Sequence, residues 1–208
     1  MKHYSKADIL SWERLFRTNL INGISGCKPT MLLGTSSSSG DYNLALFSSV
    51  VHVGANPPLL GVIMRPPVVD RHTLENIRQT GIFTMNHVHA GIVEQAHHTS
   101  AKYKRNVSEF EKAGLTAAFL DGFTAPYVAE SKIRMGLQMV NEIPIPANGT
   151  LLIVGEVLHL YVSGNLIGEK GMIDMQEAEG LTVSGLNTYY TCNRFMELPF
   201  ARPEENES

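Results

Sequence analysis

Short apolar segments separated by turn-forming residues dominate the first half of the chain. They predict strands at residues 31–35, 44–53, 59–64 and 82–88, each rich in Val, Leu, Ile or Phe. A Ser/Gly turn joins the first two segments, and a proline pair stands on each side of the third. This punctuation indicates a protein built mainly from strands.

The second half continues the pattern, with strands predicted at residues 127–140 and 151–162. Short helices are expected at residues 5–20, about 74–80, 91–101 and from Ser108 onward. The strand–helix alternation of a doubly wound sheet is absent, so the sequence predicts an antiparallel barrel with peripheral short helices. We expect one domain over residues 1–208, with a polar, frayed tail at residues 200–208.

Several helix ends have recognisable signals. Asp70 or Thr73 is expected to cap the helix that Gly81 ends. Ser108 and Glu111 have the spacing of a capping box.

The composition and charge argue against several classes of function. The chain has 208 residues, of which 43% are hydrophobic and 18% charged, and this suffices for a full core. Its net charge of -3 gives no reason to expect a nucleic acid or an anionic membrane as partner. No apolar run has the length of a membrane span, and the N-terminus is too charged for a signal peptide. Cys27 and Cys192 fit no metal or redox spacing, so we expect free thiols and a cytoplasmic protein.

The polar residues between the strands predict a site for a flat, phosphorylated cofactor. The Ser/Gly turn offers backbone and hydroxyl donors to the polar edge of a ring. Arg65 and Arg71 bracket the start of the next helix, and a helix N-terminus carries free N–H groups and about half a positive charge. Arginine adds fork-shaped donors that match phosphate oxygens. The alternative is a solvated basic turn. Two arginines at one helix start favour the anion site over this alternative.

Several motifs follow one another in a familiar order: KPTMLLGT, GDYNLALFSSV, NPPLLGVIMRP and DRHTLENIRQTGIFTMN. By these motifs the chain resembles the flavin reductase-like family of FMN-binding split barrels, which includes flavoredoxin. The segment EQAHHTSAKYKRNVSEFEKAGLTAAF resembles the helical insertion of that family, at about residues 90–115. The resemblance implies a six-stranded Greek-key barrel, a homodimer, and one FMN per subunit near the dimer interface.

The resemblance also implies a reaction, in which NADH or NADPH passes a hydride to flavin N5. The reduced flavin then gives its electrons to an acceptor that the sequence does not identify. We assign no catalytic side chain beyond the cofactor cradle, because the hydride chemistry belongs to the cofactor. Two other functions stay open: a non-enzymatic FMN carrier or sensor, and a pyridoxamine-phosphate oxidase-like enzyme.

The resemblance suggests residues for the flavin ring. Thr35, Ser36 and Asn43, with the backbone of Leu44 and Ala45, are expected to meet its pyrimidine edge. Donors there would stabilise the negative charge of reduced flavin. The alternative is that these polar residues only form a hairpin turn.

The remaining cradle candidates concern the ribityl phosphate and the ring face. The phosphate candidates are Arg65, Arg71, His72 and Thr73. Ser48 and Ser49 are expected to face the ribityl chain or phosphate, unless they bond a neighbouring carbonyl. Met64 is a candidate cover for the ring face, although a methionine in a strand is more often core.

Two further features of the sequence concern the surroundings of the site. Many family members carry a cysteine where this chain has Gly136, so activity that needs this thiol is in doubt and a wider pocket is expected. His87, His89, His97 and His98 lie close in sequence, but their spacing does not demand a converging metal site. We expect no metal, and we expect polar roles near the cofactor or the dimer seam for these histidines.

Overall fold

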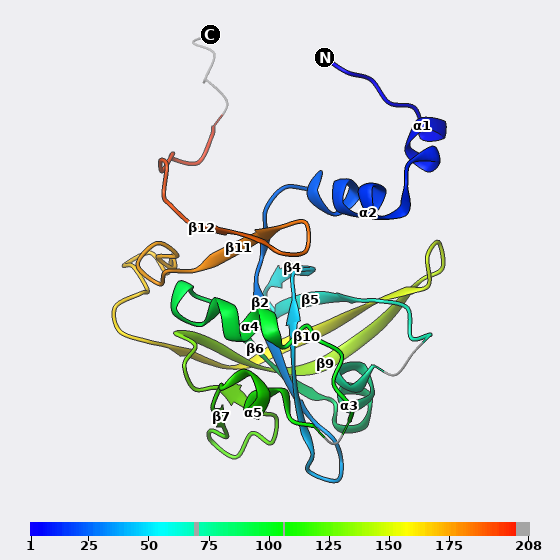
Figure 1. The fold of residues 1–208 in the computed structure, drawn as a ribbon. Coiled ribbons are helices and arrows are strands. Elements are labelled where there is room, and N and C mark those ends of the chain that lie inside the picture. Colours follow the sequence, from blue (N-terminus) through cyan, green and yellow to red (C-terminus); the bar gives the residue numbers. More distant parts are fainter. Residues whose placement is uncertain (69–70, 106, 203–208) are drawn as a thin grey trace.

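An antiparallel sheet with strand order β3-β2-β6-β9-β10-β5-β4 forms the centre of the computed structural model, which describes residues 1–68, 71–105 and 107–202 (Figure 1). Its strands are β2 (Met31–Ser36), β3 (Tyr42–Phe47), β4 (Val50–Ala55), β5 (Pro58–Met64), β6 (Ile82–His87), β9 (Ile133–Ile145) and β10 (Thr150–Val162). Each pair of neighbours is antiparallel. The protein is mainly β, as the sequence predicts.

The two edge strands, β3 and β4, are consecutive in the chain. Only Ser48 and Ser49 separate them, so the sheet must curve until its two edges approach each other. The carbonyl of Ser49 accepts a hydrogen bond from Ile63 N at 3.0 Å, which continues the pairing of β4 with β5. This curvature produces the split barrel.

The predicted single strand at residues 44–53 is wrong, because the chain breaks at the serine pair. The Ser49 hydroxyl donates to the carbonyl of Ile63 at 2.9 Å, an interaction that an apolar residue could not make. The break raises the number of strands in the sheet to seven. Counted as one strand, β3 and β4 restore the expected six, arranged as two meanders of three.

The barrel interior is filled by apolar side chains from every part of the sheet. Leu33, Phe83, Leu137 and Ile153 are completely buried in one cluster. Helix α3 (His72–Thr80) adds the fully buried side chains of Leu74 and Ile77 to that cluster. The start of α3 is thereby fixed against the barrel.

The predicted helix at residues 5–20 is wrong in its length, because two helices, α1 (Lys6–Ser11) and α2 (Arg14–Gly23), take its place. Trp12 has an extended backbone, with ψ of 149°. The Glu13 carboxylate then accepts from two backbone N–H groups of α2 and starts a new helix. Neither helix contains a buried residue, and both stand away from the barrel (Figure 1).

The helix signals are confirmed in part. Gly81 ends α3 with φ of 74°, as predicted. Asp70 lies outside the described residues, and Thr73 does not cap α3: the cap position is Arg71, whose N–H donates to Glu75 at 3.0 Å. The predicted capping box is wrong, because the buried Ser108 hydroxyl has no hydrogen-bond partner among the described residues.

The remaining elements surround the barrel. The insertion contains a 3-10 turn η1 (Ala90–Ile92), α4 (Val93–His98) and α5 (Glu109–Ala113). Two small sheets consist of β7 (Ala117–Ala118) with β8 (Tyr127–Val128), and of β1 (Lys28–Pro29), β11 (Leu181–Ser184) and β12 (Thr188–Thr191).

The predicted strand at residues 127–140 is wrong in its bounds, because its first residues pair in β8 and β9 starts at Ile133. Residues 192–202 form neither helix nor strand, and residues 203–208 of the predicted tail lie outside the described part. Among the described residues, no helix combines the length and the apolar character needed to cross a membrane.

Candidate functional site

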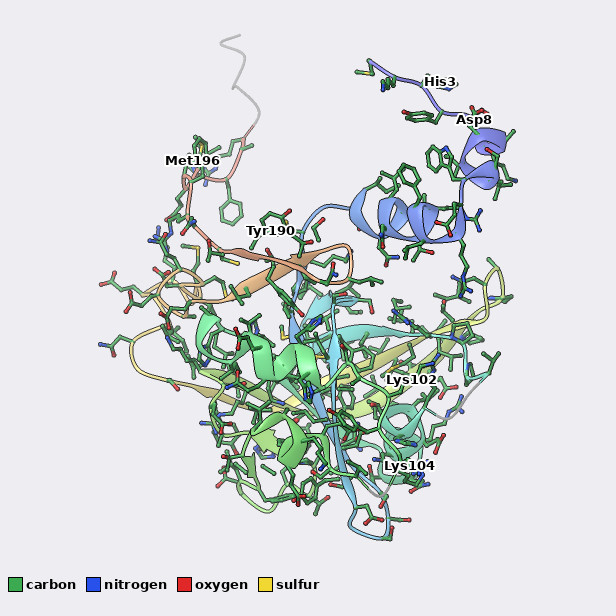
Figure 2. The ribbon with its side chains drawn as sticks, in the orientation of Figure 1. His3, Asp8, Lys102, Lys104, Tyr190 and Met196 are labelled. Atoms are coloured by element: carbon green, nitrogen blue, oxygen red, sulfur yellow. The ribbon has the colours of Figure 1, made fainter. Side chains whose placement is uncertain are left out.

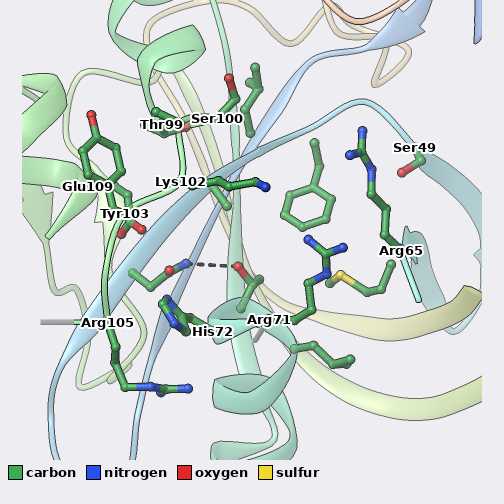
Figure 3. A pocket seen from close by; sticks show the side chains of 18 of the residues that line it. Ser49, Arg65, Arg71, His72, Thr99, Ser100, Lys102, Tyr103, Arg105 and Glu109 are labelled. Atoms are coloured by element: carbon green, nitrogen blue, oxygen red, sulfur yellow. Dashed lines mark hydrogen bonds between the residues drawn. The ribbon is translucent and has the colours of Figure 1, made fainter. Parts of the chain in front are cut away.

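A cavity of about 740 Å³ lies between β3, the end of β5, the start of α3 and the segment after α4 (Figure 3). Nine of the predicted site residues line it: Asn43, Ala45, Ser48, Ser49, Met64, Arg65, Arg71, His72 and Thr73. These residues come from three segments of the chain, residues 43–49, 64–65 and 71–73. The tertiary structure therefore brings most of the predicted cradle together.

The other three predicted residues, Thr35, Ser36 and Leu44, do not line this cavity. All three are buried and bonded within the protein. The Thr35 hydroxyl accepts from the side chain of Asn76 at 3.1 Å, and the Ser36 hydroxyl donates to the carbonyl of Thr124 at 2.8 Å. The N–H of Leu44 donates to the Glu109 carboxylate at 3.2 Å.

Positive charge gathers at one part of the cavity. The end groups of Arg65, Arg71 and Lys102 point into the same region from three different segments (Figure 3). Arg65 directly follows β5, and Arg71 stands at the start of α3. The buried Nε of Arg71 has no hydrogen-bond partner within the described residues. An unpartnered guanidinium N–H beside a helix start is suited to an oxyanion.

A seven-residue strap, defined here as Thr99–Arg105, lines the cavity along its whole length. Its cations are Lys102, Lys104 and Arg105, and Figure 2 shows the two lysines on the side of the molecule where α3 lies. Sequence reasoning did not assign the strap to the site. The signal it could have used is the basic run K-Y-K-R, directly after the histidine-containing helix.

Buried polar side chains form the floor between β3, α3 and α5. In the amide orientation that satisfies both ends, the Asn43 oxygen accepts from Thr73 Oγ1 at 3.0 Å and Leu44 N at 3.1 Å, while its nitrogen donates to Glu109 at 3.3 Å. Burial raises the pKa of the Glu109 carboxyl above its usual range. The hydrogen bond from the Leu44 N–H lowers this pKa, but by less than burial raises it. Through its bonds to Thr73 and Glu109, the Asn43 side chain connects β3 to α3 and α5.

An apolar wall adjoins the cationic part of the cavity. Its side chains are Ala45, Leu46, Phe47, Ile63, Met64 and Leu74. The cavity is thus lined by apolar as well as cationic side chains.

The histidines lie in separate surroundings. Burial lowers the pKa of His87 to about 4. His89 contacts the carbonyl of Glu130 at 3.0 Å, and His97 contacts the hydroxyl of Tyr189 at 2.7 Å. Within the described ranges, no three His, Cys, Asp or Glu side chains could hold a metal together.

The expectation of a wider pocket at Gly136 is wrong. A Cβ atom at this position would lie 2.3 Å from the hydroxyl of Tyr127, so the missing side chain leaves no open space. Tyr127 is completely buried, and its ring packs on Phe123. The glycine admits a tyrosine into the core.

Comparisons with known proteins agree with this geometry. The model of the flavin reductase like domain family matches residues 25–180. An uncharacterized protein of Halalkalibacterium halodurans is 30% identical over 171 residues, covering 79% of this chain and 81% of its own. A solved flavin reductase-like protein with a split barrel domain from Shewanella frigidimarina is 45% identical, with a TM-score of 0.93, 97% of this chain covered and 100% of its own.

A more distant structure shows the same fold. Nitrilotriacetate monooxygenase component B from Bacillus cereus is 24% identical, with a TM-score of 0.83 and coverage of 95% of this chain and 98% of its own.

Proposed function

Because the chain belongs to the flavin reductase-like family and is a flavin-related oxidoreductase, we propose that it binds FMN in the cavity and that NADH or NADPH reduces this flavin. The observation that carries the proposal is that one cavity is lined both by apolar side chains and by a group of cations. FMN needs both kinds of lining, because it carries a flat ring and a phosphate.

The residues at the cationic end fit a phosphate. Its charge of about -1.5 to -2 at neutral pH needs several donors. Arg65 and Arg71 would supply guanidinium N–H groups, and the first turn of α3, with His72 and Thr73, would supply backbone N–H groups. The unpartnered Nε of Arg71 supports this assignment, since a buried donor without a partner is costly. Lys102 of the strap adds a third positive charge.

The apolar wall would cover one face of the ring, with Met64 and Phe47 as its largest side chains. Among the described residues, β3 pairs with β2 alone, so the backbone groups on its other edge lie outside the ladder and would be available to the polar ring edge. Bound FMN would supply the redox chemistry by accepting a hydride from the nicotinamide. The protein binds, orients and shields the cofactor from water.

The proposal includes a homodimer. Helix α2 exposes several large apolar side chains: Leu15, Phe16, Leu20 and Ile21. Exposed Val51 and Val53 of β4, and Leu158 and Leu160 of β10, add apolar surface on the barrel. Uncovered surface of this kind favours association with a second copy. Both cysteines are free, which supports a reducing cytoplasm as the location.

The test is the visible spectrum of the purified protein with added FMN, followed anaerobically as NADH and then NADPH are added. Flavin bands that bleach with either nucleotide support the reductase and identify its donor. Bands that persist favour a carrier, and oxygen consumption with pyridoxamine phosphate would favour an oxidase. A protein that takes up no FMN rules out the proposal.

A further inference from the structure

Within the described part of the chain, one side-chain contact joins the strap to a distant element. Arg105 forms an ion pair with Glu75 of α3. Among the described residues, the other side-chain bonds of the strap reach only α4. Thr99 donates to the carbonyl of Ala96, Ser100 donates to that of His97, and the Tyr103 hydroxyl lies 3.0 Å from His98 Nδ1. The Glu75–Arg105 pair is therefore the contact that joins the strap to α3.

Glu75 has a second bond, which links the pair to the phosphate candidates. One carboxylate oxygen accepts from the N–H of Arg71 at 3.0 Å, and the other pairs with Arg105. The same side chain thus fixes the start of α3 and the end of the strap. Glu75 does not itself line the cavity.

We propose that Glu75 is a positioning residue, and that its ion pair with Arg105 is a latch that holds the strap across the cavity and slows the release of bound flavin. The inference rests on the proposed function and concerns the residence time of the bound flavin. The two side chains are 35% and 47% exposed, so the pair is a partly solvated one and can open.

The direction of the change in FMN release rate distinguishes the latch from a purely electrostatic effect of Glu75. Glu75→Gln removes a negative charge near a cationic site, so electrostatics alone would make a phosphate bind more tightly and leave more slowly. Loss of the latch would make release faster. Glutamine can still accept the N–H of Arg71, so the start of α3 is preserved.

The experiment measures the FMN release rate after rapid dilution, by the return of flavin fluorescence. We expect release to be about 2- to 5-fold faster in E75Q, the range for an exposed ion pair. Added salt should accelerate release in both proteins, because it screens the phosphate contacts, but more strongly in the wild type, where it also weakens the Glu75–Arg105 pair. Release that is unchanged or slower in E75Q overturns the latch.

The matched control is E142Q. Glu142 pairs with Arg78 at the far end of the same helix, at 2.5 and 2.8 Å, and neither residue lines the cavity. E142Q should leave the release rate unchanged. An equal acceleration in E142Q would mean a general loosening of α3 and would also overturn the latch.

A second measurement needs no flavin. Lys102, Lys104 and Arg105 are trypsin sites, and a strap released from α3 should be cut faster. We expect faster cleavage after Lys102 and Lys104 in apoprotein carrying E75Q or R105Q, and no further gain in the double variant. Equal cleavage in wild type and variants contradicts the latch. Failure of the wild type to take up FMN would instead contradict the proposed function.

Discussion

At Arg71, the backbone and the side chain have different tasks. The backbone N–H donates to Glu75 and starts α3, while the guanidinium lines the cavity with its Nε unpartnered. A substitution that keeps the backbone therefore tests the side chain alone.

We expect Arg71→Ala to weaken FMN binding by about 1–3 kcal/mol, the range for losing a charged hydrogen bond. Titration of the apoprotein by flavin fluorescence measures the dissociation constant. Arg78→Ala serves as the control, since Arg78 belongs to the same helix and pairs with Glu142 outside the cavity. Equal affinities for the wild type and Arg71→Ala would remove Arg71 from the phosphate site.

His87 predicts a pH dependence of stability. Burial lowers its pKa to about 4, whereas unfolding restores the ordinary value near 6.5. Between these values the unfolded chain binds more protons, so the contribution is complete above pH 6.5 and is lost as the pH falls toward 4. The free energy of unfolding should drop by at most about 3 kcal/mol from this residue. Urea unfolding at pH 7 and pH 4.5 measures it, and an equal drop in His87→Gln would contradict the assignment.

At the scale of elements, a hydrogen bond to a neighbouring strand can interrupt an apolar run. The serine pair divides one apolar run into β3 and β4, because the Ser49 hydroxyl bonds across to β5. One predicted helix is likewise divided in two. Trp12 has an extended backbone, and the Glu13 side chain caps the start of α2. Helix and strand types were predicted more accurately than their bounds, since a bound depends on single hydrogen bonds.

The contact of β9 with Tyr127 gives a prediction at this scale. Gly136→Ala should destabilise the fold by about 1–3 kcal/mol, because its Cβ would lie 2.3 Å from a buried hydroxyl. Thermal and urea unfolding measure the loss. Adding Tyr127→Phe removes the clashing oxygen and should recover much of it. A stable Gly136→Ala variant with an unchanged melting temperature would show that Tyr127 moves freely.

For the whole molecule, the N-terminal arm (residues 1–24) is separable from the barrel. Neither of its helices contains a buried residue, while the barrel has its own continuous core. The arm nevertheless exposes a row of large apolar side chains. Its apolar face therefore has a partner outside this chain in the proposed dimer.

We expect deletion of residues 1–24 to preserve the barrel, by circular dichroism and FMN absorbance, and to shift the protein from dimer toward monomer. Light scattering over a range of protein concentrations measures the mass. An intact dimer after the deletion would assign the interface to the barrel strands alone. A collapsed, unfolded product would contradict the separation of arm and barrel.

The sequence by itself determined the features that depend on chain neighbours. Alternating apolar residues indicated the strands, Gly81 indicated the end of α3, and Arg65 with Arg71 indicated positive charge near the start of that helix. Each signal is local, because backbone conformation and helix termini are set within a few residues.

Only the tertiary structure decided which distant segments meet. It brought the strap and Glu109 to the cavity, joined Glu75 to Arg105, and filled the space at Gly136 with Tyr127. It left Thr35 and Ser36, which the sequence placed at the ring edge, bonded inside the protein. The physical reason is that packing selects through-space neighbours by shape and by the need to satisfy buried polar groups, and neither requirement is visible along one chain.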